Sequence, residues 1–424
     1  MLASMLPPPL NSLRFTKIDF GKVPIHFVNI DVHKTDAGGI KLVMDLDWDG
    51  VCDIELNAEK LPKIGVQHVK LNGKLSILLC PLTNVIPLIG AAQVAFISPP
   101  RLHLDFTDAG GIGNIGLVDR AVRKIALSII SSMAVLPKRF LVKLDSNNDY
   151  FKTYQHPLGV LRLTIESGQN FGEEKKTRNI LKKLVHDVPD CFVKVIVSPQ
   201  DQWQTSTIKN DRHPEWNETH DFLVSDIEQV IELDVKDDDT VSDDNLGVGS
   251  TTVKQLLLDG GKQEINLNHE DQPTDAKVTL SGQFFRFVPD ATSFSEQGSG
   301  ICGLLTVLVA SAFGIKGRRQ ELKPSVKVSW GEQVFRTAIK SDAPGSDIEN
   351  PSFDQAFNVE IKAGMVPGPP VRIALMDKEE EIGAVEVGLG DVLAASDLAL
   401  QQDFDIAQGT TVRAGIWLRG IRQA

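Results

Sequence analysis

Residues 159–167 read GVLRLTIES, and residues 303–311 read GLLTVLVAS. Both stretches alternate in the manner of β-strands. Each is followed by an asparagine turn and an aromatic strand, which read KNDRHPEWNE at residues 209–218 and NPSFDQAF at residues 350–357. Each copy later has a strand that ends in acidic residues, then a Leu-Gly or Ile-Gly pair at residues 246–247 and 382–383. This order predicts two copies of one β-sandwich of roughly 120–130 residues.

The composition of the 424-residue chain is that of a globular protein, with 42% hydrophobic and 24% charged residues. Its net charge of -12 argues against nucleic acid as a partner. The four cysteines are far apart and form no CxxC pair, which predicts reduced thiols rather than a zinc site.

Residues 75–100 carry no charge, but Pro81, Pro87 and Pro99 argue against a membrane-spanning helix there. Residues 1–10 lack a basic segment, so we expect no secretory signal. The sequence therefore predicts a soluble protein, or one held to membranes by its surface.

The middle of the chain is the most acidic part. Residues 156–290 hold 14 Lys+Arg and 25 Asp+Glu, a net charge of 14 − 25 = −11. Five of these acids lie in one predicted loop: Asp237, Asp238, Asp239, Asp243 and Asp244. Carboxylates ~4 Å apart repel by about 1 kcal/mol per pair even in water. Calcium, which takes six to eight oxygen ligands, would relieve this repulsion. The alternative is a solvated acidic turn without an ion.

The motif order from residue 159 onward, with VPDCFVKV at residues 188–195, resembles the C2 domain. The resemblance covers about residues 158–288 and 302–420. It implies calcium ligands in the first copy: Asp190, Asp237, Asp239 and Asp244, with Glu173, Glu174, Asp187 and Asp243 as further candidates. In the second copy Lys323 takes the place of Asp190 and the third loop, residues 376–381, is short. We therefore expect that copy to bind little or no calcium.

Two basic loops are candidate membrane contacts. The first combines apolar residues at helical spacing with Lys175, Lys176, Lys182 and Lys183. It predicts a short amphipathic helix that lies on anionic lipid, or one that packs on the domain's own core. In the second copy, Arg318 and Arg319 either touch acidic lipid or belong to a solvated loop.

The first third of the chain has another pattern. Apolar residues alternate along predicted strands around residues 40–48, 69–79 and 94–106, and residues 115–136 have helical periodicity. This predicts a long curved antiparallel sheet with one apolar face and a helix. Periodicity leaves open whether the interior is filled or forms a groove. The predicted interior residues are Leu42, Met44, Leu46, Leu75, Ile77, Leu79, Phe96, Leu102, Leu104, Ile125, Ile129 and Met133.

The order and spacing of Pro81, Pro87, Gly90, Phe96 and Pro100, and AVLPKRFLVKL at residues 134–144, resemble the SMP lipid-transfer domain. SMP followed by two C2 domains is similar to extended synaptotagmins, tricalbins and plant synaptotagmins. The resemblance implies an α+β SMP domain over residues 1–150 with a TULIP-like lipid groove, then two all-β C2 sandwiches. The family's N-terminal hydrophobic hairpin has no counterpart here, so we expect a peripheral or soluble form with a short first domain.

The resemblance also implies a function. It predicts calcium-regulated glycerolipid transfer and membrane tethering on the cytoplasmic side of endoplasmic reticulum–plasma membrane contacts. Calcium, glycerolipid cargo, anionic phospholipid membranes and a second copy bound through the SMP domain would be its ligands and partners. The alternative is a calcium-dependent tether that transfers no lipid. We expect no enzyme, because the sequence holds no GxSxG, HExxH or P-loop motif.

Overall fold

The computed structural model describes residues 14–35, 38–57, 64–107, 115–145, 150–172, 188–238, 244–270, 272–295, 300–407 and 409–424. The first domain contains seven described strands and one long helix: β1 (Arg14–Asp19), β2 (His26–Lys34), β3 (Ile40–Asn57), β4 (Ile64–Leu79), β5 (Ala91–Phe96), β6 (Arg101–Thr107), α1 (Ile115–Ala134) and β7 (Phe140–Lys143).

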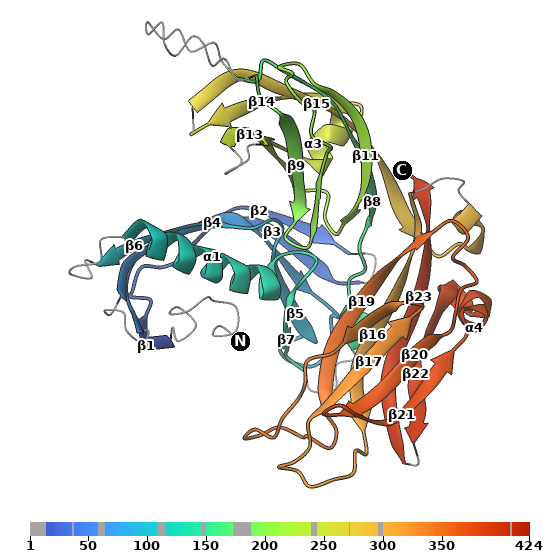
Figure 1. Cartoon of the computed structure of the whole chain (residues 1–424). Coiled ribbons are helices and arrows are strands. Elements are labelled where there is room, and N and C mark those ends of the chain that lie inside the picture. The colour runs from blue at the N-terminus through green and yellow to red at the C-terminus, as the bar shows by residue number, and fades with distance from the viewer. Residues whose placement is uncertain are drawn as a thin grey trace, which may run out of the picture.

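The sheet of the first domain is built around the long antiparallel pair β3–β4. β1 and β2 pair with opposite ends of β3, and β6 and β5 pair with opposite ends of β4. Strands this long twist, so the sheet curves, and α1 runs along it in contact with β5 and β6 (Figure 1). The stretch predicted as one strand around residues 94–106 is two strands, because Pro99 and Pro100 have no N–H to continue the ladder.

The first of the two predicted β-sandwiches, called the first C2 domain after the family it resembles, follows a short helix, α2 (Tyr150–Thr153). Its elements are β8 (Gly159–Gln169), β9 (Cys191–Ser198), β10 (Asp201–Gln204), β11 (Glu215–Val224), β12 (Val230–Asp237), β13 (Asp244–Thr252), α3 (Val253–Leu258), β14 (Lys262–His269) and β15 (Gln272–Val288). Along β8 the side chains of Leu161, Leu163 and Ile165 are fully buried in the core. This is the half-buried strand that the alternation predicted.

The second C2 domain begins after η3 (Ala291–Ser295) and repeats the arrangement. Its elements are β16 (Ile301–Phe313), β17 (Pro324–Trp330), β18 (Gln333–Arg336), β19 (Ser352–Lys362), β20 (Val371–Asp377), β21 (Glu380–Val387), α4 (Leu389–Ala394), η4 (Ser396–Leu398), β22 (Ala399–Ala407) and β23 (Thr410–Gln423). The end of β15 pairs with the end of β23, from Phe285–Gln423 to Val288–Gly420. The two C2 domains thus share one continuous sheet.

The first domain also contacts both C2 domains. Its Lys41 pairs with the buried Asp226 of the first C2 domain, and the Val230 N–H donates to Ser98 Oγ at 2.9 Å. On the other side, Lys143 Nζ lies 2.7 Å from Asp354 Oδ2 of the second C2 domain.

Two expectations concern the chain as a whole. All four cysteines are reduced thiols, as the sequence predicted, and the structure shows that they are buried. Within the described residues, no helix has both the length and the apolar character that crossing a bilayer requires.

Candidate lipid-binding interior and calcium loops

The curved sheet of the first domain gathers apolar side chains on the face that α1 covers. Eight predicted interior residues lie in one cluster there: Leu42, Met44, Leu46, Leu75, Ile77, Phe96, Leu102 and Leu104. Alternate residues of β3 and β4 point to this face, which is why Leu42, Met44 and Leu46 share it. The cluster also contains Trp48, Cys52, Ile54, Val66, Val69, Val122 and Val135, which the interior prediction omitted. Continuing the alternation of β3 to Ile54 would have found several of them.

The interior is only partly closed. Leu42, Ile77 and Leu102 are half-buried although they pack in the cluster. Leu79, Ile125 and Ile129 are half-buried and lie outside it, and Met133 is 49% exposed. Ile125, Ile129 and Met133 of α1 therefore keep contact with solvent, although Val122 of the same helix is buried. Such surface is costly in water unless something apolar covers it.

The opposite face of the same sheet is packed differently. Val43, Ala95, Ile97 and Leu136 form a separate small cluster there, and Leu78 is 2% exposed. A shift of one residue in strand register exchanges the two faces. The register of β3 against β4, with Met44 opposite Leu75, places the predicted residues on the α1 side.

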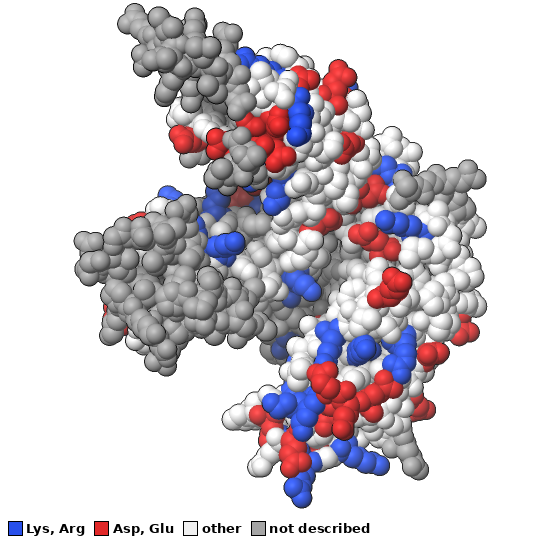
Figure 2. All heavy atoms as spheres, in the orientation of Figure 1, with Lys and Arg blue, Asp and Glu red and all other residues white. Residues whose placement is uncertain are grey.

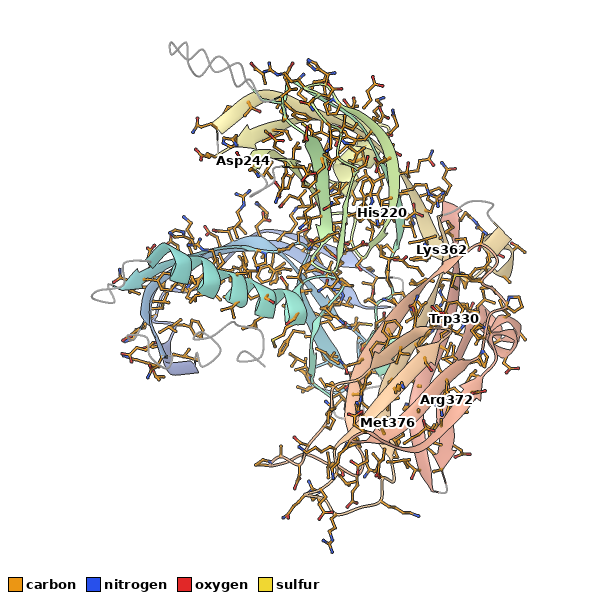
Figure 3. The ribbon with its side chains drawn as sticks, in the orientation of Figure 1. His220, Asp244, Trp330, Lys362, Arg372 and Met376 are labelled. Carbon is orange, nitrogen blue, oxygen red and sulfur yellow. The ribbon has the colours of Figure 1, made fainter. Side chains whose placement is uncertain are left out.

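The predicted calcium ligands that the structure describes lie at one end of the first C2 domain. Asp237 Oδ1 accepts a hydrogen bond from the Asp190 N–H at 2.7 Å. Asp237 and Asp244 are the last facing pair of β12 and β13, and Figure 3 labels Asp244 at this end of the domain. Asp190 Oδ1 accepts from the Asn210 N–H at 2.8 Å. Strand ends therefore bring Asp190, Asp237 and Asp244 to a common edge.

Other candidates for this site lie outside the described residues: Glu173, Glu174, Asp187, Asp239 and Asp243 among the ligands, and Lys175, Lys176, Lys182 and Lys183 among the membrane contacts. Within the described part of the chain, no group of three or more His, Cys, Asp or Glu side chains is arranged to hold a metal ion. A calcium site at this edge would therefore need ligands from outside the described residues.

The field at this edge is negative. The pKa of the Cys191 thiol is raised to about 12, first by burial and then by the charges of Asp237, Asp211 and Asp190. Carboxylates that crowd together in this way are the oxygen donors calcium prefers. The donor chemistry of the edge therefore fits a divalent cation.

The second C2 domain has the same backbone arrangement with other side chains. The Lys323 N–H donates to Asp377 Oδ1 at 2.7 Å, as the Asp190 N–H does to Asp237. Arg336 donates to the carbonyl of residue 378, and its Nη1 lies 2.8 Å from Glu379 Oε1. The Arg336 cation thus stands beside the acids of this loop, to which Lys323 is bonded through its backbone. Sequence reasoning found Lys323 but missed Arg336, because nothing in the sequence shows that β18 ends beside this loop.

Arg318 and Arg319, the predicted membrane-contacting residues of the second C2 domain, have different partners in the structure. The Arg318 side chain is 85% exposed and lies 3.3 Å from Glu321. Arg319 instead donates to Asp342 Oδ1 at 2.9 Å and to the Ser346 carbonyl. Figure 2 shows basic and acidic side chains mixed on this end of the second C2 domain, and acidic ones grouped on the first.

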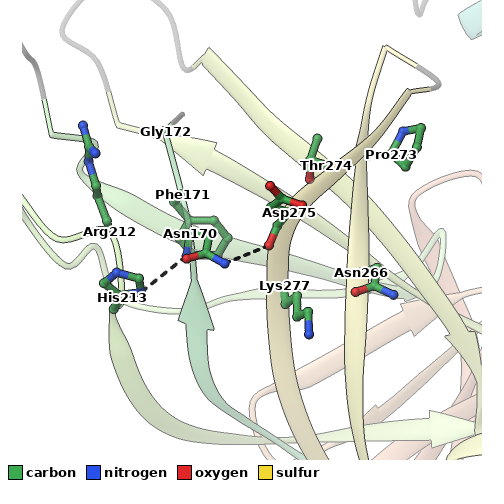
Figure 4. Close-up of a pocket in the computed structure, with 10 residues that line it drawn as sticks. All are labelled: Asn170, Phe171, Gly172, Arg212, His213, Asn266, Pro273, Thr274, Asp275 and Lys277. Atoms are coloured by element: carbon green, nitrogen blue, oxygen red, sulfur yellow. Dashed lines mark hydrogen bonds between the residues drawn. The ribbon is translucent and has the colours of Figure 1, made fainter. Parts of the chain in front are cut away.

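A pocket of about 630 Å³ opens on the first C2 domain (Figure 4). The Asn170 N–H donates to His213 Nδ1 at 3.4 Å, and Asn170 Nδ2 donates to the Asp275 carbonyl at 3.0 Å. Arg212 and Lys277 also line it, and Lys277 pairs with Glu264. This polar pocket is unsuited to an acyl chain, and no sequence motif pointed to it.

Comparisons with known proteins match this architecture. The family model described as the synaptotagmin-like mitochondrial-lipid-binding domain, or SMP domain, matches residues 8–145. The model of the C2 domain matches residues 159–267 and 303–404. The chain is therefore an SMP domain followed by two C2 domains, and the predicted fold class is confirmed.

Curated relatives point to one family. Extended synaptotagmin-1 of Mus musculus is 24% identical over 416 residues, which cover 94% of this chain and 37% of the relative. Extended synaptotagmin-2-A of Xenopus laevis is 29% identical over 456 residues, which cover 97% of this chain and 51% of the relative. The chain is homologous to the extended synaptotagmins and spans about a third to a half of the length of these relatives.

Solved structures agree on the fold. A structure of the SMP domain and two C2 domains of extended synaptotagmin 2 superposes with a TM-score of 0.64 at 22% identity, covering 100% of this chain and 92% of that one. A calcium-bound structure of the two C2 domains alone has a TM-score of 0.50 at 21% identity and covers 64% of this chain and all of that one.

Proposed function

We propose that this chain transfers glycerolipids between membranes that its C2 domains hold together, with calcium acting through the first C2 domain. The contacts between endoplasmic reticulum and plasma membrane are the setting that the homology favours, with the chain on their cytoplasmic side. No covalent chemistry is required, since transfer needs only a covered path for the acyl chains and two bilayers nearby.

The observation that carries this proposal is the partly open apolar interior of the SMP domain. Exposing a sixteen-carbon tail to water costs on the order of 13 kcal/mol at about 0.8 kcal/mol per methylene. The face lined by Met44, Leu75 and Leu104 would remove most of that cost. The half-buried Ile125 and Ile129 of α1 would then contact the acyl chain.

The C2 domains would supply proximity to the membranes. Asp190, Asp237 and Asp244, with Asp239 and the alternatives Glu174, Asp187 and Asp243, would hold the calcium ion. Bound calcium supplies positive charge at an edge that otherwise repels anionic headgroups. In the second C2 domain Lys323 and Arg336 already stand beside the acidic loop, so its membrane contact would not depend on calcium.

Lipid exchange by the full chain tests this proposal. Donor liposomes carry a fluorescent phospholipid, acceptor liposomes carry phosphatidylserine, and both transfer and vesicle clustering are followed with and without calcium. We expect transfer that calcium accelerates. Clustering without movement of the fluorescent lipid would instead show a tether that transfers nothing.

A further inference from the structure

The first strand of the second C2 domain is buried on both faces. Residues 301–312 of β16 are all buried, whereas the equivalent β8 alternates between buried and half-buried side chains. On its outer face β8 carries Arg162, which pairs with Asp221, and Thr164, which bonds Thr219. The corresponding outer face of β16 is mainly apolar, with Leu308 and Ala310, and the hydroxyl of Thr306 on this face is buried and donates to Asn358 Oδ1 at 2.8 Å. A strand buried on both faces needs a covering element on each side.

The segment between the SMP domain and the first C2 domain covers this outer face. We call residues 150–157 the linker. Its Phe151 and Tyr154 pack on Leu308, Ala310 and Trp417 of the second C2 domain. The centroid of the Trp417 ring lies 5.9 Å from that of Phe151 and 5.0 Å from that of His156. Arg413 Cζ stands 5.2 Å from the Phe151 ring centroid, a cation–π arrangement.

The outer face is shaped to receive these rings. Small residues form its floor, since Ala356 and Ala399 pack in the same cluster. A Cβ atom added to Gly415 would lie 2.3 Å from the Trp417 ring, so the ring lies along the strand over a residue without a side chain. Tyr154 Oη donates to Asn358 Oδ1 at 3.5 Å on the neighbouring strand β19.

The linker is also held close to both of its ends. Before it, Lys143 Nζ lies 2.7 Å from Asp354 Oδ2, whose side chain is only 17% exposed. Within it, the Thr153 carbonyl accepts from the Gln93 side chain of the SMP domain. After it, the Leu158 N–H donates to the Val224 carbonyl at 2.7 Å. The linker therefore contacts the SMP domain and the second C2 domain, and the residue that follows it is bonded to the first C2 domain.

We propose that the outer face of β16, β19 and β23 is a docking surface for the chain's own linker, which locks the SMP domain to the C2 pair. The three domains then move as one body, instead of as units joined by a flexible tether. The distance between the lipid-binding interior and a docked membrane would be set by this body. This inference does not rest on lipid transfer.

The test removes the linker's rings in the full chain. The variant F151A/Y154A leaves both C2 cores intact, because these residues lie outside them. We expect trypsin to cut the linker about tenfold faster than in the wild type, since local opening frees the backbone of residues 150–157. Small-angle scattering should show a larger maximum dimension. V334A, at a residue 55% exposed on β18, is the matched control and should change neither.

A second pair of variants tests the same lock without changing aromatic packing. K143E should loosen the linker, and K143E combined with D354K should restore the wild-type cutting rate. Equal cutting of wild type and F151A/Y154A would overturn the docking. Faster cutting with unchanged dimensions would overturn the lock, because the Lys41–Asp226 contact would then suffice to hold the SMP domain.

Discussion

The interiors of the SMP domain and of the first C2 domain differ in how far they exclude water. In the first C2 domain Leu161, Leu163 and Ile165 have no exposed surface. In the SMP cluster Leu46 and Leu104 remain 8% and 9% exposed, and several of their neighbours are half-buried. Both interiors come from strands with the same apolar alternation. The difference indicates that the C2 interior is a closed core and that the SMP interior is only partly closed.

Replacing one leucine by alanine in each interior should give the largest difference between the two domains, measured as lost free energy of unfolding. Leu163→Ala would leave a cavity in a closed core and cost about 3 kcal/mol or more. Leu46→Ala would cost about 1–2 kcal/mol, because its surroundings are already partly open. Hydrogen exchange of the full chain, read domain by domain, measures both values. Equal losses would mean that the SMP interior is as tightly packed as the C2 core.

The contact between the linker and the second C2 domain includes His156, and acid should weaken it. Burial, aided by the charge of Arg419, lowers the pKa of His156 to about 3, against 6.5 for an ordinary histidine. The unfolded or undocked state therefore takes up a proton below pH 6.5, and the docked state does not. Stability is then lost as the pH falls from about 6.5 toward 3, by about 2 kcal/mol at pH 5.

Trypsin cutting of the linker between pH 7 and pH 5 measures this loss, after correction for the protease's own pH dependence. His156→Gln should flatten the profile, while the half-buried Tyr154 stays neutral throughout because its pKa is raised to about 12. A profile with the same slope in wild type and His156→Gln would assign the acid sensitivity to another group.

A bulky side chain introduced into the SMP interior should block it and leave the C2 domains unchanged. Ile77→Trp or Leu104→Trp places a ring where an acyl chain would lie, so we expect lipid exchange to fall about tenfold or more. Vesicle binding should be unchanged. Val51→Trp, at a position on β3 that is 66% exposed, is the control and should exchange lipid normally. Undiminished exchange in both interior variants would show that these residues do not line the path.

The two C2 domains should differ in their response to calcium. Asp237→Asn with Asp239→Asn should remove the calcium-dependent gain in binding to phosphatidylserine vesicles, a change of about fivefold to tenfold. Asp377→Asn, at the matching position beside Lys323, should leave that gain in place. A gain that survives the first pair, or is lost with Asp377→Asn, would contradict the assignment of calcium to the first C2 domain.

The sequence was sufficient for the fold but only partly for the site. Alternation assigned Leu42, Met44 and Leu46 to one face, because a strand has a strict period of two. It could not show how completely α1 covers that face, since coverage depends on how distant elements pack. For the same reason Arg336 was missed, as its contact with Glu379 joins segments 43 residues apart.

The position of the linker also could not be predicted from the sequence. The linker, residues 150–157, lies between two domains, and nothing in its composition indicates what it packs against. The signal was in residues 303–311, where the apolar residues are more continuous than in residues 159–167. A strand covered on both faces has that pattern, but only the structure shows that the linker is the cover.

The most direct test of the central claim is to identify what the SMP interior binds. The full chain is purified without added lipid, its bound lipids are extracted, and mass spectrometry measures their identity and amount. We expect glycerolipid in a stoichiometric amount, and a marked reduction of it in Ile77→Trp. A folded chain that binds vesicles yet carries no lipid would contradict an open, ligand-accepting interior.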